Sequence, residues 1–371
     1  MYLFTFFALA FLSWINVSGK ISTKQVHILM TLALSWLVFH DGLRWAVGTD
    51  WNGYLGMFQK SVDGNFNNIE WGYYYLNYIV AQLTGSYTIL LLAIAIIQYS
   101  SLFSICKKYS IFPLLSIWLY YFNMVSYMGM NRQFLAMSLL MCSIPYIIER
   151  RVLFFILLLT LSVSIHTASI LFAPAYFFIN LREKRTYIIL LTIATAIALS
   201  GIINKLPIEL LYFFGDRIGG KAMMHVEEQL GVSMMSVALG ILKRLIWICL
   251  LFTCWDKIKE SSSLKLFFNL YFVSVIFYVV FNGTILQILV QRGILYYSVF
   301  EFVLIPIIFL KLKKKGYLPV LLFLTMVYGV WQMEKSMNYF KKSLGFDIFR
   351  PYNAIYIDSN KVNPERVDEV Y

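Results

Sequence analysis

The chain alternates long runs of apolar residues with short polar connections. Many of the runs hold about 17 to 25 residues, the length of helix that crosses about 30 Å of hydrocarbon. Taken as one crossing each, with a shorter pair around residue 166, they predict twelve membrane-spanning helices. Their approximate bounds are 1–17, 26–43, 86–105, 111–129, 133–148, 152–165, 167–180, 187–203, 233–255, 264–290, 293–310 and 317–333. We therefore expect an all-α polytopic membrane protein with a single integral membrane domain over residues 1–371.

Positive charge gathers in the connections after every odd-numbered span. These clusters lie at 20–24, 107–108, 149–151, 182–185, 256–265 and 311–315. Together they carry an excess of 12 positive charges, which equals the net charge of the whole chain. An excess of Lys and Arg marks cytoplasmic loops, so we expect both termini on the outer face of the membrane. The net charge then reflects topology, and we expect no nucleic-acid partner.

Three long segments fall on the predicted outer face. They are the loop 44–85, the loop 204–232 and the C-terminal tail 334–371. Residues 70–85 are rich in tyrosine and short for a span, and we interpret them as an amphipathic helix lying in the outer interface.

Composition supports the membrane assignment and excludes several kinds of site. Hydrophobic residues make up 60% of the chain and charged residues 13%, against about 25% charged residues in soluble domains. The four cysteines fall in predicted spans or near the cytoplasmic side, so we expect no external disulfide. No Cys/His cluster has zinc spacing and no phosphate-binding loop is present. We expect no metal and no cofactor.

The stretch RWAVGTDWNGYLGMF, residues 44–58, is unusual for a connector after an apolar segment. It carries Arg44 and Asp50, and glycines at 48 and 53 flank the acid. We interpret it as part of a site, with Gly48 and Gly53 turning the backbone so that Arg44 and Asp50 face a substrate.

Other ionisable residues lie where a membrane makes them costly. Each has an ordinary explanation beside the functional one: Arg132 is also explained as a helix-end arginine, His166 as a polar residue with satisfied hydrogen bonds, and Glu301 as an ion-pair partner of a nearby cation. Arginine forks suit phosphate oxygens, and a lipid pyrophosphate at the outer leaflet would need cations at this depth. The candidates on the outer side are Arg44, Arg132, Arg217, Lys243, Arg244 and Arg292.

Several short motifs appear in an order that resembles a known family. They are R-x-x-VGTDW-x-x-Y at 44–54, E-x-GYY at 70–74, NRQ-x-LA at 131–136, H-x-AS-x-L at 166–171, R-x-x-x-YY at 292–297 and PY at 351–352. This set resembles the EpsG-like branch of the Wzy-type bacterial polysaccharide polymerases, which make O-antigen, capsule or exopolysaccharide.

The resemblance implies a helical bundle of the C-type glycosyltransferase architecture in the bacterial inner membrane, with its site at the periplasmic face. It implies a metal-independent glycosyltransferase that uses undecaprenyl-pyrophosphate-linked oligosaccharides as donor and acceptor, with membrane lipids around it and a chain-length regulator as a partner.

On this hypothesis the arginines, with Lys243, hold the donor pyrophosphate, and Tyr54 and Tyr296 line the substrate site. Glu70, Asp50 and His166 are the candidates for proton transfer, with Glu70 or Asp50 favoured as base and His166 as an orienting group.

Three other functions remain as alternatives. A lipid-linked oligosaccharide flippase would share the spans and internal cations, but it has no need of outer loops that combine acids and arginines. An O-antigen ligase would share the donor, but it normally has one larger outer loop late in the chain. An O-acetyltransferase would need an acyl source on the cytoplasmic side.

Overall fold

The computed structural model describes residues 1–64, 69–180, 183–206 and 234–355. Within these residues the chain is α-helical, and its only β-type pairing is an isolated bridge between Arg44 and Ala354. The all-α prediction is confirmed. The helices are α1 Tyr2–Ser18, α2 Thr23–Gly42, α3 Trp51–Val62, α4 Trp71–Thr84, α5 Tyr87–Tyr109, α6 Pro113–Met124, η1 Val125–Tyr127, α7 Asn131–Ile148, α8 Val152–Ile165, η2 Thr167–Asn180, α9 Lys184–Ser200, η3 Ile202–Lys205, α11 Met234–Phe252, α12 Trp255–Glu260, α13 Ser262–Phe281, α14 Gln287–Ser298, α15 Glu301–Lys313 and α16 Leu318–Leu344.

Local sequence signals account for several helix ends. Ser22 and Gln25 form a capping box before α2, in which each side chain accepts the other residue's backbone N–H. Pro113 begins α6, where a missing N–H costs nothing. Gly19 and Gly85 end α1 and α4 in the left-handed conformation that favours glycine.

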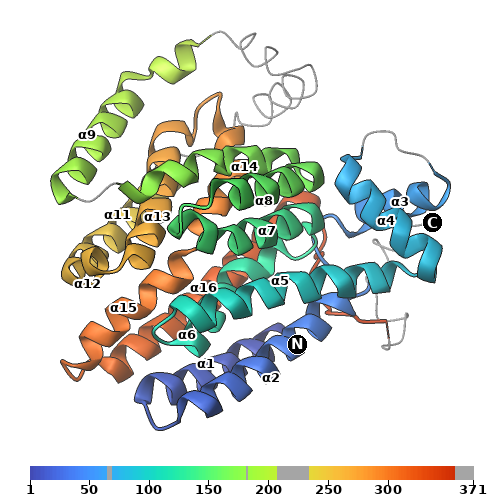
Figure 1. Ribbon diagram of the computed structural model, residues 1–371, viewed down its shortest axis with the longest axis horizontal. Coiled ribbons are helices and arrows are strands. Elements are labelled where there is room, and N and C mark those ends of the chain that lie inside the picture. Colours follow the sequence, from blue (N-terminus) through green and yellow to red (C-terminus); the bar gives the residue numbers. More distant parts are fainter. Residues whose placement is uncertain (65–68, 181–182, 207–233, 356–371) are drawn as a thin grey trace. The chain divides into compact units, whose positions relative to one another are not determined.

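The chain divides into two compact units. The first comprises Met1–Tyr146, Arg151–Ile170 and Ile305–Tyr371, and the second comprises Ile147–Arg150 and Leu171–Leu304. In the first unit, α2 packs along α5 and α1 along α6, as Figure 1 shows. Helix α16 packs against α1 and α6, while α3 and α4 pack on each other and α4 reaches α5 and α8.

The second unit is built around α13. Helices α9, α11, α12 and α14 all pack against it. Its side chains Leu266, Phe267 and Phe268 are fully buried. Tyr187 of α9 enters this core, and its hydroxyl donates a hydrogen bond to Asn269 of α13.

Few of the helices have the length and composition of a complete membrane span. Helices α5 and α13 do, and the pair α14 and α15, bent by 52°, would make a third span if it counts as one. Shorter apolar helices include Tyr2–Ser18 and Val152–Ile165. The described residues are therefore compatible with a membrane protein, but they do not confirm twelve spans. Breaks are one reason, since the predicted segment 111–129 divides into α6 and η1.

The predicted break between two short helices at residue 166 is confirmed, while their crossing of a membrane stays a prediction. Helix α8 ends at Ile165, His166 adopts an extended conformation, and η2 begins at Thr167. The sequence signal was local, because the polar stretch at the apex interrupts two apolar runs.

Part of the region after residue 333, which was predicted as a polar outer tail, is helical or packed in the structure. Helix α16 continues to Leu344, and the segment after it folds back with Ile348, Phe349 and Ala354 buried. This C-terminal segment lies against the loop between α2 and α3: Trp45 N–H donates to Asn353 O at 3.1 Å and Ile355 N–H donates to Leu43 O at 3.0 Å. The pairing satisfies backbone groups that an irregular loop would otherwise leave without partners.

Candidate active site

The loop between α2 and α3 packs against the turn before α7 through two glycines. Gly48 and Gly129 have φ values of 107° and 111°, which L side chains rarely adopt. A Cβ on Gly48 would collide with the Met128 carbonyl, and one on Gly129 would lie 2.5 Å from the Thr49 nitrogen. Thr49 N–H donates to Met128 O at 2.8 Å across this contact. The VGTDW and NRQ motifs are therefore neighbours.

Gly48 and Gly53 were both expected to turn the backbone, but the structure gives them different roles. Gly48 makes a turn, as expected. Gly53 lies inside α3, where a Cβ would meet nothing within 4 Å. It is therefore not a joint of the loop, because the helix begins before it.

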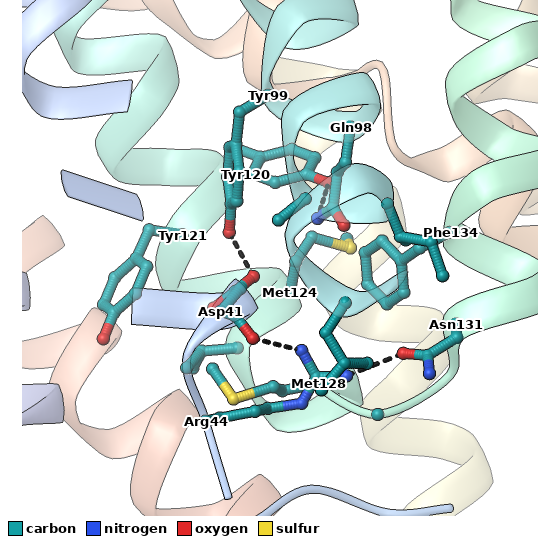
Figure 2. A pocket seen from close by; sticks show the side chains of 15 residues that line it. Asp41, Arg44, Gln98, Tyr99, Tyr120, Tyr121, Met124, Met128, Asn131 and Phe134 are labelled. Carbon is teal, nitrogen blue, oxygen red and sulfur yellow. Dashed lines mark hydrogen bonds between the residues drawn. The ribbon is translucent and has the colours of Figure 1, made fainter. Parts of the chain in front are cut away.

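The structure also separates the two charged residues that were expected to face a substrate together. Asp50 is exposed at the N-terminal boundary of α3. The Arg44 side chain instead turns inward and is only 4% exposed. Figure 2 shows it beside Asp41 and Asn131 at the wall of a small cavity.

A second glycine contact brings α4 against α8. Gly72 in the E-x-GYY motif packs so closely on Ser164 that a Cβ at residue 72 would collide with the serine hydroxyl. Glu70 lies at the N-cap of α4, two residues before Gly72. His166 lies at the C-cap of α8, two residues after Ser164. The Ser162 hydroxyl donates to Ala136 O at 3.0 Å and ties α8 to α7. The ends of three helices thus meet in one place.

Arg132, Glu70 and His166 form a cluster at this meeting point. The Arg132 guanidinium makes an ion pair with Glu70 Oε2. His166 Nδ1 lies 3.9 Å from the other oxygen, Glu70 Oε1. Arg132 Nε also donates to the Tyr54 hydroxyl at 3.4 Å. The three charged or titratable side chains are 12% to 17% exposed, so the cluster is partly accessible.

The surroundings of Glu70 keep its carboxyl ionised. Burial acts to raise its pKa, but the His166 side chain and the charge of Arg132 together act more strongly and lower the pKa from 4.5 to about 2. For Tyr54, burial dominates and raises the pKa despite the nearby arginine. The cluster therefore presents a cation, a carboxylate and an imidazole together, which is a set able to bind an anion and to transfer a proton.

A family model matches residues 27–344 of the chain, and its description is "EpsG family". The chain belongs to the EpsG family. The match covers the motif segments that supply Arg132, Glu70 and His166. No curated protein and no solved structure matched the chain. Membership of the EpsG family supports a polysaccharide polymerase-type function, with a glycosyltransferase-like activity and lipid-linked sugars as substrates.

The aromatic residues of the motif segments 44–54 and 70–75 in this EpsG-family chain include a buried and an exposed set. Trp51, Tyr54 and Tyr73 are buried and pack with one another between α3, α4 and α5. Trp71 and Tyr75 of α4 are more than half exposed. Only the second set offers open ring faces, so most of the aromatic residues near the motif form a core.

The second unit holds the other predicted site residues. Arg244 stacks over the ring of Tyr278 at 3.5 Å and donates to Gly240 O at 3.0 Å. The charges of Lys243 and Arg244 act on the carboxyl group of Glu301, and pairing of Glu301 with either cation stays a prediction. Arg292 and Tyr296 both lie on α14, where Tyr296 is buried. Arg217 lies outside the described residues.

Sequence reasoning missed a buried polar network beside the loop. Asp41 accepts a hydrogen bond from the Tyr99 hydroxyl, and its other carboxylate oxygen lies 2.9 Å from His40 Nδ1. Asn131 contacts Arg44 from the start of α7. Asp41 follows an apolar run, as the candidate ionisable residues do, but its partners are far away in the sequence.

Proposed function

We propose that this EpsG-family protein is a polymerase that joins undecaprenyl-pyrophosphate-linked oligosaccharide repeat units at the periplasmic face of the bacterial inner membrane. One observation carries the proposal beyond family membership: three motif segments distant in sequence supply an arginine, a carboxylate and an imidazole to one partly accessible cluster. Such a cluster suits the transfer of a sugar from a phosphate leaving group to a hydroxyl.

In the proposed reaction an acceptor sugar hydroxyl attacks the anomeric carbon of the donor. The new glycosidic C–O bond forms as the bond from that carbon to the pyrophosphate oxygen breaks. The carrier lipid pyrophosphate leaves with the bonding electrons, and the hydroxyl proton passes to a base. Arg132 binds the pyrophosphate and stabilises the negative charge that grows on it.

The surroundings of Glu70 favour a revised assignment of the proton acceptor. A carboxylate with a pKa of about 2 is a weak base. We therefore assign proton acceptance to His166 and assign to Glu70 the task of orienting both His166 and Arg132. Asp50 is exposed at the start of α3 and stays a candidate for contact with the acceptor.

Further contacts to the donor are proposed from the sequence pattern alone. Lys243, Arg244, Arg292 and Arg217 stay candidates for positive charge at the pyrophosphate. Tyr54 and Tyr296 are not kept as sugar contacts, because both side chains are buried. A metal ion or cofactor has no role in this proposal. A chain-length regulator is the proposed protein partner, and both termini are placed in the periplasm by the distribution of basic residues.

The first experiment compares surface polysaccharide by electrophoresis in a deletion strain. The strain carries wild type, Arg132→Ala, Glu70→Gln, His166→Ala or the exposed control Arg185→Ala, each at matched membrane abundance. We expect full ladders from wild type and Arg185→Ala, and collapse to a single repeat unit on the lipid core from the other three.

Other outcomes point elsewhere. Loss of the single-repeat band as well would favour export or ligation, because units would then fail to reach the lipid core. A full ladder from Arg132→Ala would overturn the proposed site.

A further inference from the structure

We infer that Arg44 is a positioning residue, which holds the first turn of α7 through Asn131 and so aims Arg132 at the donor. The inference rests on the proposed function of Arg132. It assigns Arg44 a role different from the substrate contact that its motif suggested.

The contacts of Arg44 all point into the protein. Its Nη2 donates to Asn131 Oδ1 at 2.6 Å and its Nη1 donates to the backbone oxygen of Asp41. Asn131 is itself 3% exposed, and its Nδ2 donates to the Tyr87 hydroxyl at 3.3 Å. One guanidinium therefore joins the C-terminal end of α2 to the N-terminal end of α7, as Figure 2 shows. Helix α5 is attached through the contact of Asn131 with Tyr87.

The position of Arg44 suits its charge. The last carbonyl groups of a helix carry partial negative charge, and a cation near them is favourable. Asp41 belongs to the last turn of α2, and its backbone oxygen is one of these acceptors. Its carboxylate is engaged by His40 and Tyr99. The fork of Arg44 is thus fixed by a helix end and by an amide side chain.

The cavity beside Arg44 is too small for the proposed donor. It has a volume of about 30 Å³, enough for roughly two water molecules, whereas pockets for small molecules reach about 300 Å³ or more. Its lining includes Gln98, Tyr120 and Phe134 from α5, α6 and α7. A pyrophosphate or a sugar therefore cannot reach the guanidinium without displacing buried side chains.

A single residue, Asn131, connects Arg44 to the cluster that contains Arg132. Asn131 and Arg132 are adjacent in the first turn of α7, and Arg132 makes the ion pair with Glu70. Without the hydrogen bond from Arg44 to Asn131, the backbone that carries Arg132 is held less firmly. Displacement of a catalytic group by about 1 Å can lower a rate on the order of 10²-fold.

The test uses purified full-length protein with lipid-linked repeat units and measures kcat and KM. The variants are Arg44→Lys, Asn131→Ala, the double variant, and Asn131→Asp, which keeps an oxygen for Arg44. We expect Arg44→Lys and Asn131→Ala each to lower kcat about tenfold or more, with KM changed less than about threefold. The double variant should be no slower than the slower single variant, and Asn131→Asp should retain most activity.

Coupling through Arg132 is tested by adding Arg44→Lys to Arg132→Lys. If Arg44 acts through Arg132, the second change should lower kcat little further. Two results would overturn the inference. One is a kcat of either double variant that falls by the product of the two single losses. The other is a normal kcat for Asn131→Ala together with a raised KM for Arg44→Lys. Failure of the proposed function reads differently, since the wild-type protein would then not elongate lipid-linked repeat units at all. Thermal stability of each variant in detergent separates these results from unfolding.

Discussion

Glu70 illustrates how neighbouring side chains set the charge of one residue. An isolated glutamate at the start of a helix titrates near pH 4.5, but the contacts with His166 and Arg132 hold this one ionised down to about pH 2. The residue type alone was compatible with a base. Its surroundings make it a fixed negative charge instead.

This lowered pKa predicts a dependence of stability on pH. Because the folded pKa lies below the unfolded one, the ionised carboxylate stabilises the fold above about pH 4.5 and loses that contribution as the pH falls towards 2. The stability advantage of wild type over Glu70→Gln should be constant from pH 8 to 6 and shrink by roughly half by pH 3. Thermal unfolding of both proteins in detergent measures it, and an advantage that is unchanged at pH 3 would contradict the lowered pKa.

Gly48 and Gly53 provide a matched pair of substitutions within residues 44–58. Gly48→Ala adds a methyl group against the Met128 carbonyl at a φ of 107°, so we expect destabilisation by about 1–3 kcal/mol. Gly53→Ala lies in a helix with open space around it and should be neutral or stabilising by about 0.5–1 kcal/mol. Unfolding temperatures of the two variants decide the matter, and equal effects would show that the glycine contact with residues 128–129 is not what holds the loop.

The charged cluster of the first unit is built from the ends of its helices. The starts of α4 and α7 and the end of α8 carry Glu70, Arg132 and His166. Helix ends are suited to this because their unpaired backbone groups and adjoining turns let side chains point along the helix axis. The C-terminal segment pairs with residues 43–45 and so holds the backbone on either side of Arg44.

The packing of the C-terminal segment predicts different stabilities for two variants in it. The Tyr352 hydroxyl donates to His40 O at 2.6 Å, and its ring stacks on the His40 ring at 4.9 Å. Ile355, three residues later, leaves its side chain exposed. We expect Tyr352→Ala to lower the unfolding free energy by about 2–4 kcal/mol and Ile355→Ala to change it by less than about 0.5 kcal/mol.

Limited proteolysis gives a second measurement for the same pair. Release of the segment in Tyr352→Ala should expose the chain after Leu344 to cleavage, while Ile355→Ala stays protected. Protection of both variants would mean that the segment is held by its backbone pairing alone.

At the scale of the whole molecule, the charge distribution predicts which face each loop occupies. In a background without the four native cysteines, Lys60→Cys should react with a thiol reagent that is added on the outer side and cannot cross the membrane. Lys314→Cys should react only after the membrane is broken. Both side chains are exposed. The reverse pattern of labelling would invert the topology and would place the Arg132 cluster on the cytoplasmic side.

The sequence by itself determined the helical class, the break at His166 and the family, because hydropathy, helix breakers and short motifs are local properties. It also identified Arg132, Glu70 and His166 as candidates. Only the tertiary structure decided that these three form one cluster while Arg44 turns inward to Asn131. It also decided that Tyr54 and Trp51 belong to a core and that residues 348–354 support the loop. The physical reason is that these contacts join residues far apart in the chain, and close packing at positions such as Gly48, Gly72 and Gly129 determines which side chains can meet.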